Sequence, residues 1–265
     1  MALRWVFDPA PPSGKRTGGD AAEYSFEGTI DILVREVVQN SLDARLTHDK
    51  PVAVTFRIVD LDGERRSTFL AALDWEGLAD NLAAVPELRG GLAVTRARKR
   101  MANESLRLLV IEDRGTRGLE GPEDRIDDVT PNPYCALVRD ELYSDKEDAS
   151  AGGSFGLGKS VLWAFSGLKT VLFASVPKTS PRARYGLRVV GRVSLPWHET
   201  QEDGQCTGDG WFGVPSGVDN ASRRAESVWG VDAEEVARAC GCWRPSGESG
   251  LTAVIVGFAE PGGDD

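Results

Sequence analysis

The chain of 265 residues is poor in cysteine and histidine and has no long apolar run. Its four cysteines form no closely spaced pair, and it has only two histidines, so a zinc site is not indicated. No apolar run approaches the roughly 20 residues that a membrane helix requires. The opening stretch is polar and proline-rich, unlike an apolar signal segment. We therefore expect no membrane span and a reduced, cytoplasmic protein.

Positive charge is also scarce: 31 Lys and Arg stand against 41 Asp and Glu, which gives a formal net charge of −10. A surface with this net negative charge is poorly suited to binding the phosphates of duplex DNA. Local basic stretches occur at residues 96–100 and 182–192, but a run of charge is usually a solvated face. We expect no direct nucleic-acid binding by this chain.

Hydrophobic residues, in contrast, make up 41% of the chain, enough for a substantial core. Helical spacing of apolar residues predicts helices over 29–46, 69–85 and 232–240, with shorter pieces at 134–142 and 159–165. Apolar and alternating runs predict strands over 52–60, 106–111, 170–176, 185–195 and 251–258. Asp62 and Gly63 predict a hairpin turn after the first strand. Without regular βαβ alternation, this pattern favours a two-layer α+β domain, with helices on one face of a mixed, mainly antiparallel sheet.

The first segment that could carry a chemical function lies on the helix over 29–46. At 100° per residue, Glu36, Asn40 and Asp43 fall within about 60° of one another, so they project from one stripe of the helix. An ordinary amphipathic helix with a polar outer face also explains this pattern. However, an amide oxygen is a hard ligand for Mg²⁺, and a carboxylate one turn away is a base toward water. The stripe therefore also suits a metal-nucleotide site.

The second segment follows the buried strand over 106–111. Asp113 at the end of this strand can accept a hydrogen bond from an exocyclic amine. Gly115 and Gly118 just beyond it let the backbone pass close to a planar base. Strand ends followed by glycine-rich turns are also routine in proteins without such a ligand, so this segment alone leaves both interpretations open.

The third segment is a glycine-rich run and is the strongest single signal. It consists of Gly152, Gly153, Ser154, Phe155, Gly156, Leu157, Gly158 and Lys159. Its backbone N–H groups, with the positive end of the following helix, can wrap phosphates. The run also fits the P-loop pattern, in which two glycines with four residues between them, here Gly153 and Gly158, precede Lys and Ser. A P-loop follows directly from a hydrophobic strand, whereas residues 144–151 are polar, so the context argues against one.

In this order the three segments resemble those of the GHKL ATPases, a family of gyrase B subunits, heat-shock chaperones of the ninety-kilodalton class, histidine kinases, MutL and MORC proteins. Residues 36–44 resemble the N-box, Asp113 and Gly115 the Asp-x-Gly of the adenine-binding segment, and residues 152–158 the glycine box that ends the ATP lid. Thr252, which opens a late apolar strand, resembles the threonine that completes the adenine pocket. The resemblance spans about residues 29–258 and implies a Bergerat-type ATP-binding fold.

The resemblance also implies a role for each matching residue. Glu36 would be the general base, Asn40 the Mg²⁺ ligand and Asp113 the acceptor for the adenine amino group. Thr252 would share a water with Asp113, and Asp43 would belong to the nucleotide site. The glycine box and Lys159 would hold the phosphates.

The whole chain, residues 1–265, would form a single ATPase domain. Within it we expect an N-terminal arm (1–28), an insertion (62–103), the ATP lid with the glycine box (114–158) and a glycine-rich insertion (204–217). Gyrase and MutL relatives add a second domain whose lysine reaches the γ-phosphate, yet only seven residues follow Phe258. We therefore expect slow hydrolysis and a protein partner that supplies further domains.

The function that these expectations define is Mg²⁺-dependent ATP binding and slow ATP hydrolysis, with lid closure and ATP-dependent homodimerisation that switch a larger assembly, DNA-related or defence-related. A non-hydrolysing ATP-sensing module is the alternative from another class, and it would not need Glu36. A histidine kinase-like phosphotransferase is disfavoured, because neither His48 nor His198 lies in a helical dimerisation segment that accepts phosphate.

Overall fold

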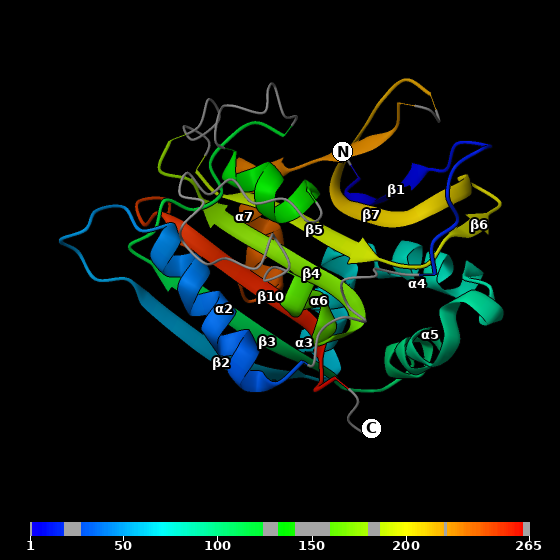
Figure 1. Cartoon of the computed structure of the whole chain (residues 1–265), viewed down its shortest axis with the longest axis horizontal. Helices are drawn as coiled ribbons and strands as arrows, with labels where there is room; N and C mark the ends of the chain where they lie inside the picture. Colours follow the sequence, from blue (N-terminus) through cyan, green and yellow to red (C-terminus); the bar gives the residue numbers. More distant parts are fainter. Residues whose placement is uncertain are drawn as a thin grey trace.

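The computed structural model describes residues 2–18, 28–123, 132–140, 160–179, 186–219 and 222–261. One large sheet runs through these residues (Figure 1). From edge to edge its main strands are β1 (Arg4–Pro9), β7 (Gly204–Ser216), β5 (Arg188–Ser194), β4 (Ser166–Val176), β10 (Gly250–Phe258), β3 (Leu106–Arg114) and β2 (Ala53–Leu61). The short strands β6 (His198–Thr200) and β8 (Arg224–Glu226) pair with β7, and β9 (Val228–Trp229) pairs with β5. Every pairing between these described strands is antiparallel.

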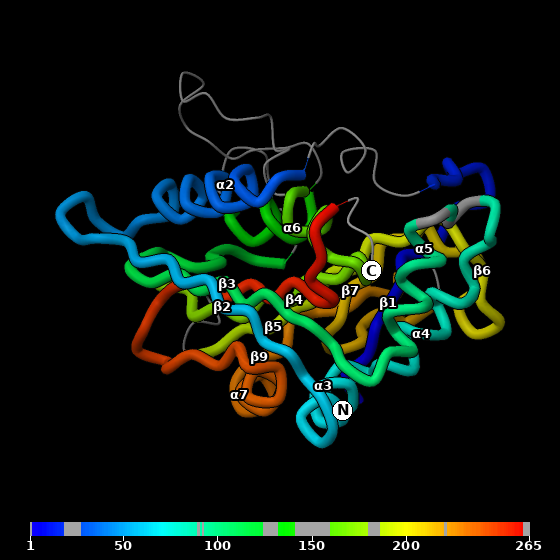
Figure 2. The backbone as a smooth tube through the Cα atoms, turned by 90° about the horizontal axis from the view of Figure 1, so that it is seen from below, coloured from blue at the N-terminus to red at the C-terminus, as the bar shows by residue number. Residues whose placement is uncertain are grey.

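Helices lie on both faces of this sheet, as Figure 2 shows. One face carries α2 (Ile30–Asp43), α6 (Val161–Ala164) and the π-helical turn η1 (Cys135–Arg139). The other carries α3 (Gly63–Ala72), α4 (Trp75–Ala84), α5 (Glu87–Met101) and α7 (Gly230–Ala239). The α+β class agrees with the expectation, but the two-layer arrangement with helices on one face is wrong.

The central strands explain the additional layer, because their side chains are apolar on both faces. On β3, Leu108 and Val110 join the core that holds Phe69 of α3, whereas Leu109 and Ile111 join the core under α2. Strands that are apolar on both sides need cover on both sides. Residues 62–103, which the sequence set apart as an insertion, contain α3, α4 and α5 and supply much of that second cover.

The N-terminal arm and the glycine-rich segment 204–217 both contribute strands to the sheet. Residues 4–9 form β1, which pairs with β7, and β7 in turn pairs with β5. Glycine permits this packing at Gly210, where an added Cβ would lie 2.7 Å from the ring of Phe7. The strands of the sheet thus come from almost the whole length of the chain.

The predicted hairpin turn at Asp62 and Gly63 is wrong, because Gly63 begins α3. The antiparallel partner of β2 is β3, which follows only after α3, α4 and α5. The residues after Gly63 have helical rather than alternating spacing, so a second strand does not follow the turn. None of the described helices combines the length and the apolar character that crossing a membrane requires.

Candidate functional site

Helix α2 places the first predicted segment against the sheet. Thr29 caps its N-terminus, and the Thr29 hydroxyl accepts a hydrogen bond from the N–H of Ile32 (3.4 Å). Leu33 is fully buried in the core between α2 and the sheet. The Glu36 side chain is 17% exposed, and its carboxylate lies 3.4 Å from the guanidinium of Arg35. Glu36 is therefore near the protein surface but is largely covered.

Asn40 is exposed although it lies on the sheet-facing side of the helix. Seven residues advance an α-helix by about 700°, so Asn40 lies within about 20° of Leu33 around the axis. Its carboxamide has no hydrogen-bond partner in the described part of the chain. Asp43, one turn further on, accepts a hydrogen bond from the amide of Gln39 (2.9 Å). Asn40 is thus the stripe residue whose oxygen is free to bind a ligand.

Asp113 lies at the end of β3, is 7% exposed and faces α2. Its Oδ1 accepts hydrogen bonds from the hydroxyl of Thr116 (2.5 Å) and the N–H of Leu251 (2.8 Å), whereas Oδ2 accepts one long bond from the hydroxyl of Ser41 on α2 (3.4 Å). Burial raises the pKa of Asp113, and the bonds from Thr116 and Leu251 oppose this rise. Because each carboxylate oxygen has two lone pairs, Oδ2 can accept a further donor.

The loop after Asp113 is joined to the C-terminal end of α2. The N–H of Leu46 donates to the carbonyl of Gly115 (3.0 Å), and the N–H of Arg117 donates to the carbonyl of Ala44 (2.8 Å). These bonds bring together two segments that the sequence analysis selected separately, the helix stripe and the strand-end aspartate. Ser41 and Thr116, which bond the aspartate, were missed because a hydroxyl beside a motif gives no signal of its own.

Gly115 and Gly118 are both required by the backbone of this loop. Gly115 has a φ of +80°, and a Cβ there would lie 2.6 Å from the carbonyl oxygen of Pro51. Gly118 has a φ of +68°, and a Cβ there would lie 2.6 Å from the hydroxyl of Ser175 on β4. Both glycines therefore let the loop pass close to neighbouring backbone, whatever further contact they make with a ligand.

Thr252 does not join Asp113. The pairing of β10 with β3 sets Thr252 opposite Glu112, and directly opposed residues share a face of the sheet. The Thr252 hydroxyl therefore lies on the face away from α2, where Arg244 donates to it (3.1 Å). The sheet separates the two side chains, so the structure does not bring together the two residues that were predicted to share a water.

Arg244 holds this end of the sheet together and was not predicted. It is 2% exposed, and it donates to the carbonyl of Asp113 (2.7 Å) and to the carbonyl of Leu251 (3.0 Å). One buried guanidinium thus fixes both strands that position the aspartate. The sequence held no signal for it, since Arg244 stands in an irregular segment before β10.

The middle of the predicted ATP lid, residues 132–140, is docked on the sheet. The guanidinium of Arg188 on β5 stacks on the ring of Tyr134 (3.4 Å). Arg192 donates to the carbonyl of Val138 (3.2 Å), and Arg139 donates to the carbonyl of Ala225 (2.7 Å). Three arginines therefore fix this part of the lid segment. Two of them, Arg188 and Arg192, belong to the basic stretch 182–192, and because all three are engaged here they do not form a basic surface patch.

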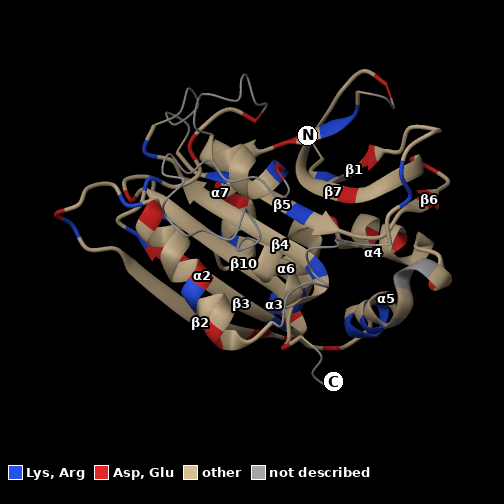
Figure 3. Ribbon diagram, viewed as in Figure 1, with Lys and Arg blue, Asp and Glu red and all other residues tan. Residues whose placement is uncertain are grey.

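The basic stretch at residues 96–100 lies on α5, where the ribbon in Figure 3 is coloured as Lys and Arg. Arg98 donates to the carbonyls of Leu82, Ala83 and Val85, so it satisfies the C-terminal end of α4. Part of this basic run thus has a structural role.

The glycine box lies outside the described residues. This applies to Gly152, Gly153, Ser154, Phe155, Gly156, Leu157, Gly158 and Lys159. The helix that follows, α6, leads into β4, which pairs only with β10 and β5 among the described strands, in both cases antiparallel. The parallel pairing that a βαβ crossover produces is thus not seen around this motif in the described residues.

The described residues include no group of three or more His, Cys, Asp or Glu side chains able to hold a metal ion. All four cysteines are buried. A magnesium ion at Asn40 would therefore take its other ligands from substrate phosphates and water, which is how Mg²⁺ is usually held beside nucleotides. The free amide oxygen of Asn40 fits that arrangement.

Comparison of the chain with protein-family models, with curated proteins and with solved structures gives no match.

Proposed function

We propose that the chain binds Mg·ATP beside α2, with the adenine at the end of β3. The observation that carries this proposal is the convergence of Asp113 with Ser41 across 72 residues of sequence, next to the exposed Asn40. A buried carboxylate with a spare acceptor position selects a ligand that carries an amino group. Mg²⁺, when bound, would neutralise phosphate charge, and Asn40 would provide one of its oxygen ligands.

Hydrolysis is the activity that Glu36 supports. Its carboxylate lies one helical turn before Asn40, so it stands near the position proposed for the phosphates. There it would take a proton from an attacking water, a contribution that is typically about 10² to 10⁴ in rate. We expect slow turnover by the isolated chain, with ATP-dependent pairing of two protomers and a protein partner as further parts of the proposal.

The test is the Glu36→Ala variant with Mg·ATP. The variant should bind ATP as the wild type does but lose turnover, and trapped ATP should shift it to a dimer in light scattering, while the wild type with ADP stays a monomer. Tight binding without a dimer would refute the pairing. Wild-type turnover by Glu36→Ala would remove Glu36 as the base.

The alternative function, a sensor that binds ATP without hydrolysis, makes the opposite prediction for turnover. Both forms of the protein would then bind ATP and neither would release phosphate above the level of a blank. The largely covered carboxylate of Glu36 favours the hydrolase, because a sensor has no use for a base at this position.

A further inference from the structure

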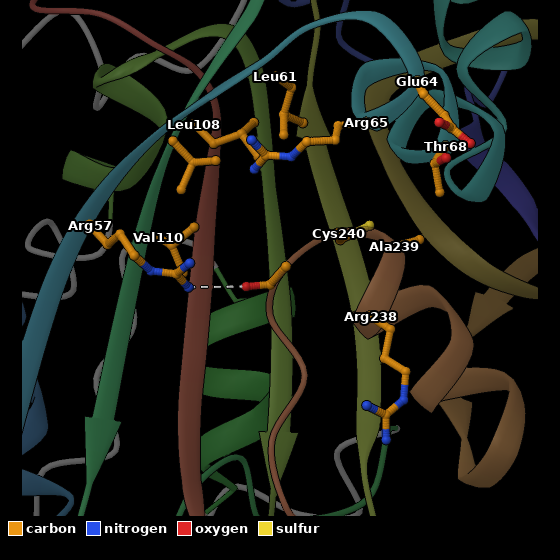
Figure 4. Close-up of a pocket in the computed structure, with 12 residues that line it drawn as sticks. Arg57, Leu61, Glu64, Arg65, Thr68, Leu108, Val110, Arg238, Ala239 and Cys240 are labelled. Atoms are coloured by element: carbon orange, nitrogen blue, oxygen red, sulfur yellow. Dashed lines mark hydrogen bonds between the residues drawn. The ribbon is translucent and has the colours of Figure 1, made fainter.

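A groove lies on the face of the sheet opposite to α2, between β2, β3, α3 and α7 (Figure 4). It has a volume of about 330 Å³ and a floor of aliphatic side chains that includes Val59, Leu108 and Val110. Arg57 reaches into it from β2 and Arg65 from α3, on opposite sides, and Arg238 of α7 completes the rim. The groove is therefore apolar at its base and basic at its rim.

Two of the three arginines at the rim have no ion pair with a carboxylate in the described residues. Arg57 makes one hydrogen bond, to the carbonyl of Gly241 (3.2 Å). Arg65 has no ion pair or hydrogen bond with any residue in the described ranges. Glu64 is the one carboxylate in the lining. Arg238, in contrast, is ion-paired with Glu234 (3.5 Å). In a chain with a net charge of −10, Arg57 and Arg65 therefore supply the local positive charge of the groove.

Strand β2 beside the groove is a free edge of the sheet. It pairs with β3 from Ala53 to Leu61, and no described strand pairs with its other side. On the face away from the groove its Ile58 side chain is 60% exposed, a large value for isoleucine on a strand. A long edge strand with an exposed apolar residue is a template for another strand unless it is covered.

The groove and the free edge of β2 together favour an added β-strand as the ligand. Side chains of an added strand would alternate between the two faces, so every second one would lie beside Arg57 and the others beside Ile58. A small molecule is less well matched, since such ligands are usually enclosed over most of their surface and this rim is exposed. The lining contains no aromatic ring on which a nucleobase would stack.

We infer that β2 and this groove bind an extended acidic segment of a partner protein, which adds a strand to β2 with its carboxylates toward Arg57 and Arg65 and an apolar side chain on Ile58. This inference does not rest on nucleotide binding, because the groove lies on the other face of the sheet.

The test uses a labelled peptide of alternating glutamate and valine, as long as β2, in fluorescence anisotropy with the whole chain. Binding should weaken as salt rises, and Arg65→Glu should weaken it by about tenfold or more, because a favourable charge pair becomes a repulsive one. Lys50→Glu, at an exposed residue outside the groove, changes the net charge equally and should change the affinity less than about twofold.

A second peptide, N-methylated at alternate residues, keeps its charge but cannot donate to the edge of β2, so it should bind at least about tenfold more weakly. Equal effects of Arg65→Glu and Lys50→Glu would overturn the groove as the binding site. Equal affinity of the methylated peptide would overturn strand addition. Tighter, Arg65-dependent binding of a single-stranded oligonucleotide would overturn the choice of a protein partner.

Discussion

Replacing Asp113 by Asn changes the proposed adenine site by one hydrogen-bonding group and should leave the fold intact. The amide oxygen of the new side chain can occupy the position of Oδ1 and keep the bonds from Thr116 and Leu251. The amide NH₂ then occupies the position of Oδ2, where it faces Ser41 and the proposed adenine amino group. Two donors would meet where a donor and an acceptor met before.

The expected loss is that of one charge-assisted hydrogen bond, about 1.5 to 3 kcal/mol, which corresponds to roughly ten- to a hundred-fold weaker ATP binding. Inosine triphosphate, with a carbonyl in place of the amino group, should lose much less, because the new NH₂ can donate to that carbonyl. The preference of the wild type for ATP over inosine triphosphate should therefore shrink or reverse in the variant.

The assay is calorimetric titration of both nucleotides into both proteins in the presence of Mg²⁺, with thermal unfolding as the check that the variant is folded. Unchanged ATP affinity in a folded Asp113→Asn protein would falsify the adenine assignment. An equal loss for the two nucleotides would also count against the adenine assignment, since Asp113 would then not distinguish the amino group of adenine from the carbonyl of inosine.

Three further changes test other parts of the structure. Thr252→Ala should leave ATP affinity within about twofold of wild type, because its side chain is on the other face of the sheet, and a large loss in titration would return Thr252 to the site. Arg244→Met should lower the free energy of unfolding by about 3 kcal/mol or more, since it leaves buried acceptors such as the Asp113 carbonyl unpaired. A free energy of unfolding close to that of the wild type, measured by chemical denaturation, would refute this. Asp8→Asn tests the pH dependence of stability. Burial raises the pKa of Asp8 from 3.8 to about 6. The folded protein therefore favours the protonated carboxyl, so the contribution of Asp8 to stability is fully present below pH 3.8 and is lost as the pH rises through 6. The variant should therefore gain up to about 3 kcal/mol over the wild type between pH 4 and 8, and parallel stability curves would contradict the burial effect.

Much of the local structure could be predicted from spacing alone. The apolar periodicity of α2 and the apolar runs of β3 and β10 lie where the sequence placed them, since each is set by residues next to one another in the chain. The position of Asp113 at a strand end followed from the same pattern. Its contact with Ser41 of α2 was not predicted, because the two residues are 72 positions apart in the chain.

The errors concern properties that depend on distant residues. The face of β10 that carries Thr252 is set by its register against β3, and a shift of one residue would reverse it. The second helical layer covers the other apolar face of β3, and which residues supply this cover depends on how distant segments pack on the sheet. The partners of Arg244 and Arg188 likewise include backbone carbonyls from other parts of the chain, which no local motif records.

The most direct test of the central claim is titration of Mg·ATP into the wild type, Asn40→Ala and Lys159→Ala. Mg·ATP should bind saturably at one site per chain, and Asn40→Ala should abolish or greatly weaken this binding, because Asn40 has the free amide oxygen beside the proposed phosphates. Lys159→Ala should cost less. Normal Mg·ATP binding by Asn40→Ala together with its loss in Lys159→Ala would contradict the account and assign the nucleotide to a P-loop, and no binding to the wild type would contradict it altogether.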